Sequence, residues 1–170
     1  AFSLEKLTWL NGEHIRRLDP QKFHELALKY YPEGVRHLDL EKISRLIQIR
    51  IERFTEIPTM VKFLYELPDY DAALFENPKS KSTLQSSREI LQEVIPLLEG
   101  MQEWTNESLF TALKDFASAH GYKIGTVMWP IRTALSGQFA SPGGATELAD
   151  LLGKDETLRR LKIGLEKLQL

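Results

Sequence analysis

Apolar residues recur at intervals of three and four along almost the whole chain, and no stretch alternates β-branched and polar residues with a period of two. The first pattern gives a helix one buried face, whereas a half-buried strand needs the second. We therefore predict an all-α fold without an internal repeat. The expected helices cover residues 2–18 (with a possible break after Asn11-Gly12), 20–30, 39–54, 59–67, 84–98, 105–120, 125–137, 145–152 and 155–168.

Short polar residues and glycines mark the ends of several predicted helices. A side-chain oxygen at the residue before a helix accepts from its unpaired N–H groups, and proline suits the first turn. Glycine adopts the left-handed conformation that ends a helix at little cost. The expected N-caps are Ser3, Asp19, Thr105 and Ser141, and the expected glycine stops are Gly121, Gly137 and Gly153.

The segment from residue 68 to residue 83 breaks the helical pattern. It contains Pro68 and Pro78 and the polar tract Lys79-Ser80-Lys81-Ser82-Thr83. Prolines and short polar residues of this kind are typical of a connection between compact units. We therefore expect two consecutive helical-bundle subdomains, residues 1–76 and 77–170.

Composition excludes several classes of function. The chain has no cysteine, which rules out disulfides and thiolate metal sites, and its four histidines lack the spacing of a metal motif. It contains neither a phosphate-binding glycine loop nor a nucleophile elbow, so we predict no catalytic residue and no metal site. Without a membrane-spanning run or a signal pattern, we expect a cytoplasmic protein that does not bind membranes. Because the chain begins at Ala1 without methionine, we expect a fragment of a longer protein.

The stretch from residue 125 to residue 148 is the strongest candidate for a binding site. Arg132 precedes the turn Ser141-Pro142-Gly143-Gly144, and Trp129 lies one helical turn before Arg132. An arginine, free backbone N–H groups and an exposed indole would suit a phosphate or an unstacked nucleic-acid base. On spacing alone, two packed helices with a tight corner account for these residues better than a binding site does. The net charge of −2 argues against bulk electrostatic binding of nucleic acid, so any such contact is expected to be local.

Motifs at both ends of the chain resemble one enzyme family. The sequence Phe2-Ser3-Leu4-Glu5-Lys6-Leu7-Thr8-Trp9-Leu10-Asn11-Gly12 is similar to the helix that follows the catalytic half of bacterial glutamyl-tRNA synthetases, which are class I aminoacyl-tRNA synthetases. The residues Trp129-Pro130-Ile131-Arg132-Thr133-Ala134-Leu135-Ser136-Gly137 with Ser141-Pro142-Gly143 resemble their C-terminal signature. The residues Leu151-Leu152-Gly153-Lys154 and Thr157-Leu158-Arg159-Arg160-Leu161 resemble their ending.

The resemblance implies two helical modules: a stem-contact and first anticodon-binding subdomain, followed by a C-terminal anticodon-binding subdomain. The expected partners are the anticodon stem-loop of the glutamate tRNA and the catalytic domain of the same protein, and we expect a monomer. In the whole enzyme, ATP and Mg²⁺ serve the attachment of glutamate to tRNA. The chain itself would lack the Rossmann domain, would be catalytically inactive and would need no cofactor.

The resemblance also implies roles for individual residues. Arg50 falls where the family places the arginine that reads the third anticodon base, and a guanidinium donor suits the O2 and N3 acceptors of an unpaired cytosine. Gly144 stands where the family commonly has leucine, so a base contact from that side chain is lost. The residues expected at the other two anticodon bases are Lys114, Trp129, Arg132, Ser141, Pro142, Gly143 and Gly144.

Each of these residues also has an ordinary structural interpretation. Arg50 could pair with a neighbouring carboxylate, Trp129 could be buried, and Lys114 could be a plain exposed lysine. The cations of the last helix favour a solvated face over an edge that contacts phosphate; they are Lys154, Arg159, Arg160 and Lys162. The alternative function is a non-catalytic helical scaffold that binds a protein partner through apolar grooves.

Overall fold

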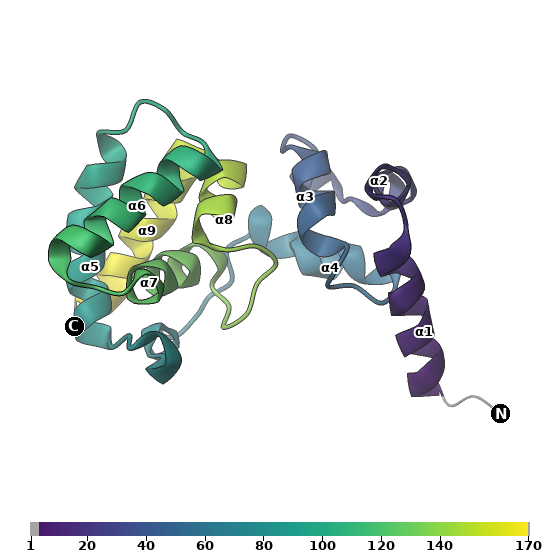
Figure 1. Cartoon of the computed structure of the whole chain (residues 1–170), viewed down its shortest axis with the longest axis horizontal. Helices are drawn as coiled ribbons and strands as arrows, with labels where there is room; N and C mark the ends of the chain where they lie inside the picture. Colours follow the sequence, from purple (N-terminus) through teal and green to yellow (C-terminus); the bar gives the residue numbers. More distant parts are fainter. Residues whose placement is uncertain (1–3, 170) are drawn as a thin grey trace. The chain divides into compact units, whose positions relative to one another are not determined.

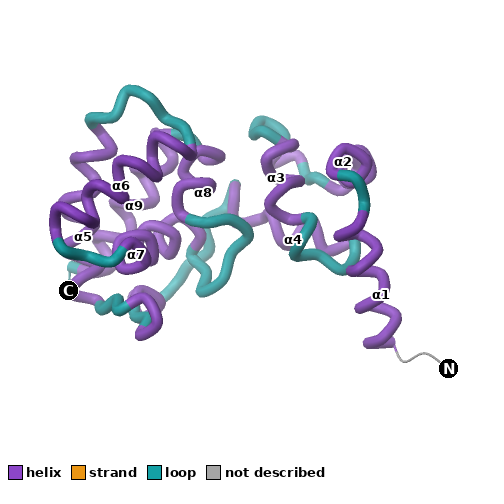
Figure 2. The backbone as a smooth tube through the Cα atoms, in the orientation of Figure 1, coloured by secondary structure: helices purple, strands orange, loops and turns teal. Residues whose placement is uncertain are grey.

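The computed structural model describes residues 4–169, and the chain divides into two compact units, Ala1–Glu66 and Leu67–Leu170. Within the described residues all regular elements are helical, and an isolated bridge between Asn77 and Ser82 is the sole β pairing (Figure 2). The predicted all-α class is therefore confirmed. The expected N-cap Ser3 lies outside the described residues.

The first unit contains α1 (Leu4–Arg17), α2 (Pro20–Ala27), α3 (Leu40–Ile47) and α4 (Ile57–Val61) (Figure 1). Single-turn 3₁₀ helices lie between them at Leu28–Tyr30, Glu33–Val35 and Phe54–Glu56, and another follows α4 at Lys62–Leu64. Asp19 caps α2 as predicted, because its carboxylate accepts from the N–H groups of Gln21 and Lys22. The break expected after Gly12 is absent, and α1 continues through it.

The predicted helix over residues 39–54 ends at Ile47, seven residues early. The side chain of Gln48 turns away to donate to the carbonyls of Ile15, at 3.1 Å, and Leu18, at 2.9 Å. Ile51 is fully buried, whereas Ile49 is exposed. The apolar residues of this stretch therefore lie partly at the end of α3 and partly in the turn that follows. After Ile47, the hydrogen bonds of Gln48 to other parts of the unit replace the bonds that would continue the helix. The helix predicted over 59–67 is likewise shorter: α4 begins at Ile57 and passes into a 3₁₀ turn at Lys62.

The second unit contains α5 (Leu84–Glu99), α6 (Asn106–His120), α7 (Ile124–Ser136), α8 (Ala145–Leu152) and α9 (Lys154–Leu168). The 3₁₀ turns Ala72–Phe75 and Pro78–Ser80 precede them. In Figure 1, α9 lies along α5. Helix α7 packs against both of them, and α8 packs against α6, α7 and α9. Thr105 and Ser108 form the expected capping box of α6, while Gly121, Gly137 and Gly153 end α6, α7 and α8.

The division between the units falls ten residues before the expected boundary at 76/77. Phe75 is fully buried in the second unit, 5.9 Å from the ring of Tyr70. Lys167, near the end of α9, donates to the carbonyl oxygen of Tyr70 at 2.9 Å. Residues 67–76 therefore belong to the second unit, because Tyr70 and Phe75 are buried there, although the composition of the segment is typical of a linker.

Candidate functional site

The corner between α7 and α8 begins with the left-handed residue predicted from the sequence. Gly137 has φ of +63° and donates its N–H to Thr133 O at 2.8 Å. A Cβ atom at this position would lie 3.1 Å from Pro68 Cδ and 3.2 Å from Pro68 O. Glycine is therefore required here both for its conformation and for the close approach of the segment at Pro68.

The prediction that Ser141 caps the next helix is wrong. Gly144 occupies the N-cap position, and its N–H donates to Glu147 Oε1 at 2.9 Å. Ser141 Oγ instead accepts from Arg132 Nη1 at 2.9 Å and lies 3.3 Å from the carbonyl oxygen of Gly143, to which it donates. The hydroxyl is turned toward α7, because the arginine offers a charged donor there.

Arg132 holds the corner together from the α7 side. Besides Ser141, its guanidinium donates to the carbonyl oxygen of Phe139 and lies 4.7 Å from the centre of the Trp129 ring. These contacts fix a half-buried cation against an aromatic face. Arg132 and Trp129 lie together, as the sequence suggests. Their contacts make both residues part of the structure of the corner.

The expectation of an exposed indole is wrong. Trp129 is only 9% exposed, its Nε1 donates to Leu74 O at 3.3 Å, and Phe139 packs edge-on at 5.2 Å. With Arg132 over the ring, the indole offers little free face on which a base could stack. Burial by the segment at Leu74 causes the difference, and this segment is more than fifty residues away in the sequence.

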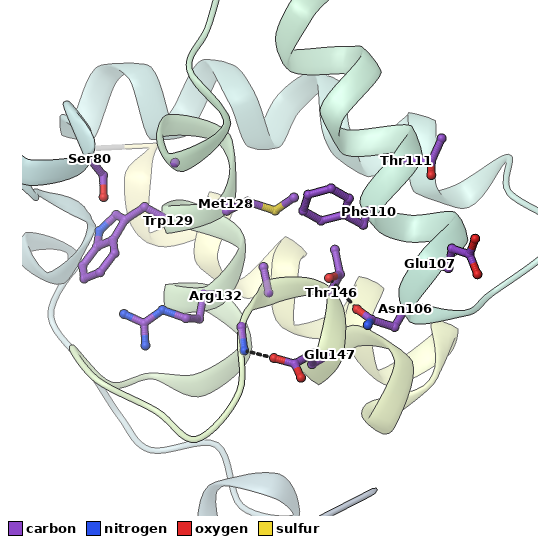
Figure 3. A pocket seen from close by; sticks show the side chains of 13 residues that line it. Ser80, Asn106, Glu107, Phe110, Thr111, Met128, Trp129, Arg132, Thr146 and Glu147 are labelled. Atoms are coloured by element: carbon purple, nitrogen blue, oxygen red, sulfur yellow. Dashed lines mark hydrogen bonds between the residues drawn. The ribbon is translucent and has the colours of Figure 1, made fainter. Parts of the chain in front are cut away.

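A cavity of about 650 Å³ opens between α6, α7 and the start of α8 (Figure 3). This volume lies within the usual range of ligand sites. Of the predicted site residues, Trp129, Arg132 and Gly144 line it, while Lys114, Ser141, Pro142 and Gly143 do not. The other lining residues are Ser80, Asn106, Glu107, Phe110, Thr111, Gly125, Met128, Ala145, Thr146 and Glu147.

Phe110 is a cavity residue that does not belong to the predicted site. Its side chain is 45% exposed, and Figure 3 shows the ring beside Met128. The buried stripe of α6 includes Leu109, Leu113 and Phe116, which follow helical spacing. Position 110 lies about 100° around the helix from Leu109, so the same spacing could have indicated that this phenylalanine faces away from the core.

Lys114 and Arg50 are exposed candidates outside the cavity. Lys114 lies on α6, one turn after Phe110, and Arg50 lies in the first unit, in the turn after α3. Within residues 4–169, neither side chain makes a hydrogen bond or ion pair. The carboxylate partner considered for Arg50 is therefore not found there, and its guanidinium donors are available to solvent.

The expectation of a solvated cationic face on the last helix is wrong for Arg160. Its side chain is 1% exposed, with Nε 2.9 Å from Glu156 Oε2 and Nη1 donating to Leu135 O at 2.6 Å. Hydrogen bonds from Arg159 and Arg160 lower the pKa of the Glu156 carboxyl from 4.5 to about 2. Arg160 therefore satisfies the last turn of α7 just before Gly137, and it is not part of an edge that contacts phosphate.

His24 and His120 make side-chain contacts within their own units. His24 Nδ1 lies 2.7 Å from Ser44 Oγ, which also lies 2.6 Å from the hydroxyl of Tyr31, and burial raises the pKa of Tyr31 to about 12. His120 pairs with Glu93 at 2.8 Å, near the end of α6. Over the part of the chain that the structure describes, no three acidic or histidine side chains gather as a metal site. No helix of that part is both long and apolar enough to cross a membrane.

Comparison with known proteins places this geometry in a family. A family model described as "anticodon binding domain" matches residues 22–165. The glutamate–tRNA ligase of Clostridium acetobutylicum is 45% identical over 172 residues, and that of Clostridium botulinum strain Hall is 46% identical over 170 residues. Each match covers 99% of this chain and 35% of the relative, so the chain spans about a third of the length of these curated relatives, at their C-terminal end.

Two solved structures share the fold. The crystal structure of a glutamate tRNA ligase from Elizabethkingia meningosepticum, in complex with its amino acid, matches with a TM-score of 0.79 and 24% identity, over 99% of this chain and 33% of that chain. Glutamate-tRNA synthetase from Elizabethkingia anophelis matches with a TM-score of 0.73 and 22% identity, over 97% of this chain and 32% of that chain. At these identities the likeness shows the helical architecture.

Proposed function

Because the chain belongs to the anticodon-binding domain family, we propose that it is the module with which a glutamate–tRNA ligase binds the anticodon stem-loop of the glutamate tRNA. The observation that carries this proposal is the family match over residues 22–165, together with 45% identity to a glutamate–tRNA ligase along nearly the whole chain. In such a ligase the module would serve the ATP-dependent attachment of glutamate to tRNA in the cytoplasm. ATP and Mg²⁺ would bind elsewhere in the enzyme, and the module would act as a monomer.

Arg50 is the residue that we propose reads the third anticodon base. Its side chain is exposed and makes no hydrogen bond within residues 4–169, while its backbone N–H donates to Ile47 O at 2.9 Å and fixes the turn. Five guanidinium N–H donors match the O2 and N3 acceptors of cytosine, whereas guanine presents N–H donors on the corresponding edge. An arginine in this place would therefore favour C over G.

The apolar residues at the start of α1 support attachment to a larger protein. Leu4, Leu7, Trp9 and Leu10 are all exposed, although they follow the helical spacing of a buried face. Exposed apolar patches on a helix mark interaction surfaces. We propose that they pack against the catalytic part of such a ligase. The glutamate–tRNA ligases that the chain matches are about three times as long as the chain.

Titration of the chain with the anticodon stem-loop tests the proposal. We expect salt-sensitive binding, and a change of the third anticodon base from C to G should weaken it by about 1–3 kcal/mol, the scale of base discrimination by a bidentate donor. Arg50→Gln should lose the preference for C more than it loses overall affinity. The matched control is Arg45→Gln, an exposed arginine on α3, which should keep the preference.

Two results would contradict the proposal. Equal binding of the C and G stem-loops by the unaltered chain would remove the role of Arg50. Absence of any salt-sensitive binding to RNA would favour the helical scaffold for a protein partner instead.

A further inference from the structure

A buried amide fastens the beginning of the turn that carries Arg50. Gln48, the residue after α3, is 7% exposed, and its Nε2 donates to the carbonyl oxygens of Ile15, at 3.1 Å, and Leu18, at 2.9 Å. Both partners are acceptors, so both amide hydrogens are used. Ile15 and Leu18 lie at or just after the end of α1, where carbonyl oxygens have no helical N–H four residues ahead. The amide therefore ties the turn to the end of α1.

The end of the same turn is tied to α1 as well. Asn11 Nδ2 donates to the carbonyl oxygen of Glu52, and Arg53 Nη2 donates to Thr8 Oγ1 at 2.6 Å. Gly12 allows the two segments to come close, because a Cβ atom there would lie 3.0 Å from Glu52 Cγ. Asn11 and Gly12 are the last residues of the N-terminal motif, so this motif contacts the turn within the first unit.

Between these two attachments, the turn presents Arg50 to solvent. The Arg50 N–H donates to Ile47 O at 2.9 Å, and the neighbouring Ile51 is fully buried, while the Arg50 side chain is exposed. Hydrogen bonds to a base edge form over a narrow range of distance and angle. An arginine on a turn can therefore discriminate between bases only if the backbone beneath it is held in place.

We infer that Gln48 and Asn11 are positioning residues for discrimination of the third anticodon base: they hold the turn on α1 so that Arg50 meets the base in one orientation. The inference rests on the proposed function and adds to it two residues that act through the turn. If Gln48 served only to stabilise the end of α1, its loss would weaken the binding of every stem-loop alike. A positioning role weakens the binding of the correct stem-loop more than that of the wrong one.

The test is the ratio of the affinities of the chain for anticodon stem-loops with C and with G as the third base, measured by fluorescence anisotropy. The unaltered chain should prefer C by about 5- to 150-fold. Gln48→Met keeps the length of the side chain but has no donor. It should lower the ratio by about twofold or more, the smallest coupling expected within one hydrogen-bond network. The loss should fall on the C stem-loop, with the affinity for the G stem-loop almost unchanged.

Two further variants test the attachments separately. Asn11→Ala removes the bond at the end of the turn, and because Asn11 is exposed the unit should stay folded. It should also lower the ratio by about twofold or more. Gln48→Lys should keep most of the preference, because an ammonium can donate to both carbonyls and suits the negative end of a helix. An equal loss in Gln48→Lys and Gln48→Met would show that the bonds to α1 are not the cause.

Tyr31→Phe is the matched control for lost stability. It removes a buried hydrogen bond with Ser44 Oγ, at 2.6 Å, in the same unit, and it leaves the bonds of Gln48 and Asn11 in place. Its C-over-G ratio should equal that of the unaltered chain, even if urea unfolding shows the same loss of stability as in Gln48→Met. Gln48→Met combined with Arg50→Gln should have the ratio of Arg50→Gln alone, because the amide acts through the arginine.

The outcomes separate the inference from the function beneath it. An unchanged ratio in Gln48→Met or in Asn11→Ala, or an equal loss of affinity for both stem-loops, overturns the inference for that residue and leaves the proposed function standing. A ratio in the double variant below that of Arg50→Gln alone also overturns it, because Gln48 would then act without the arginine. If the unaltered chain shows no preference for C, the proposed role of Arg50 and this inference are both overturned.

Discussion

The turn after α3 and the corner after α7 each follow a helix end, and a candidate arginine lies in the turn or contacts the corner, but the two are built differently. The corner has a left-handed Gly137, and Arg132 ties it to Ser141 and Phe139. The turn has no glycine, and Arg50 within it is exposed and makes no side-chain hydrogen bond in the described part of the chain. One arginine is used by the fold, and the other is left for a ligand.

This difference shows that two candidate arginines of one chain can have separate tasks. A guanidinium whose donors are already satisfied adds rigidity and shape, because a partner would have to replace existing bonds to use it. A guanidinium with unsatisfied donors adds specificity, because a correct base gains bonds that a wrong one does not. We therefore propose that Arg132 fixes the shape of the corner and that Arg50, in the turn, discriminates between bases.

The largest expected effect breaks the corner itself. Gly137→Ala should lower the free energy of unfolding by about 2–4 kcal/mol, since the left-handed conformation costs about 1–2 kcal/mol and Pro68 must move as well. Gly121→Ala is the control: it has φ of +72° but nothing within 4 Å, so it should cost about 1–2 kcal/mol. Urea unfolding measures both, and equal losses would show that the packing against Pro68 has no energetic weight.

The next effect separates the two arginines. Arg132→Met should lower the free energy of unfolding by about 2 kcal/mol, because it removes hydrogen bonds from a charged donor and leaves the Ser141 and Phe139 acceptors unpaired. Arg50→Met should change it by less than about 0.5 kcal/mol, as surface substitutions do. Thermal and urea unfolding of the pair check this. A comparable loss for Arg50→Met would mean that the turn also depends on its arginine.

The smallest expected effect concerns acid. Because the pKa of Glu156 is lowered from 4.5 to about 2 in the folded chain, its contribution to stability is present above pH 4.5 and is lost as the pH falls toward 2. Its carboxylate supports Arg160 and so the end of α7. We expect about 1 kcal/mol, because solvent reaches the pair.

Unfolding of Glu156→Gln at several pH values between 5 and 2 should show a shallower loss of stability than the unaltered chain. Glu13→Gln is the comparison in the first unit, where the carboxylate pairs with Arg16. It should leave the acid response of the second unit intact. An unchanged slope in Glu156→Gln would show that this carboxylate does not support the corner.

Local chemistry explains the parts of the fold that the sequence predicts correctly. The Asp19 cap, the capping box at Thr105 and the glycine at the end of α7 involve atoms within four residues of one another. Such interactions depend on residue type and spacing alone. The candidate residues Trp129, Arg132 and Gly144 line one cavity because they flank a single corner of the chain.

Long-range contacts explain the parts that the sequence does not predict. The third helix stops early because Gln48 bonds to the carbonyls that end α1, thirty residues upstream. Trp129 is buried because the segment at Leu74 covers it, and Arg160 is buried because Leu135 O offers it an acceptor. None of these partners is adjacent in the chain, so residue type and spacing do not indicate them.

The sequence by itself determined that the chain is helical, where most helices start and stop, and which family its motifs resemble. Helical periodicity and capping depend on residues that are close in the sequence, and a family motif is itself a sequence pattern. Tertiary structure decided which side chains remain available to a ligand, because exposure depends on what the rest of the chain covers. That is why Arg50 and Phe110 are open to a partner while Trp129 and Arg160 are held by the fold.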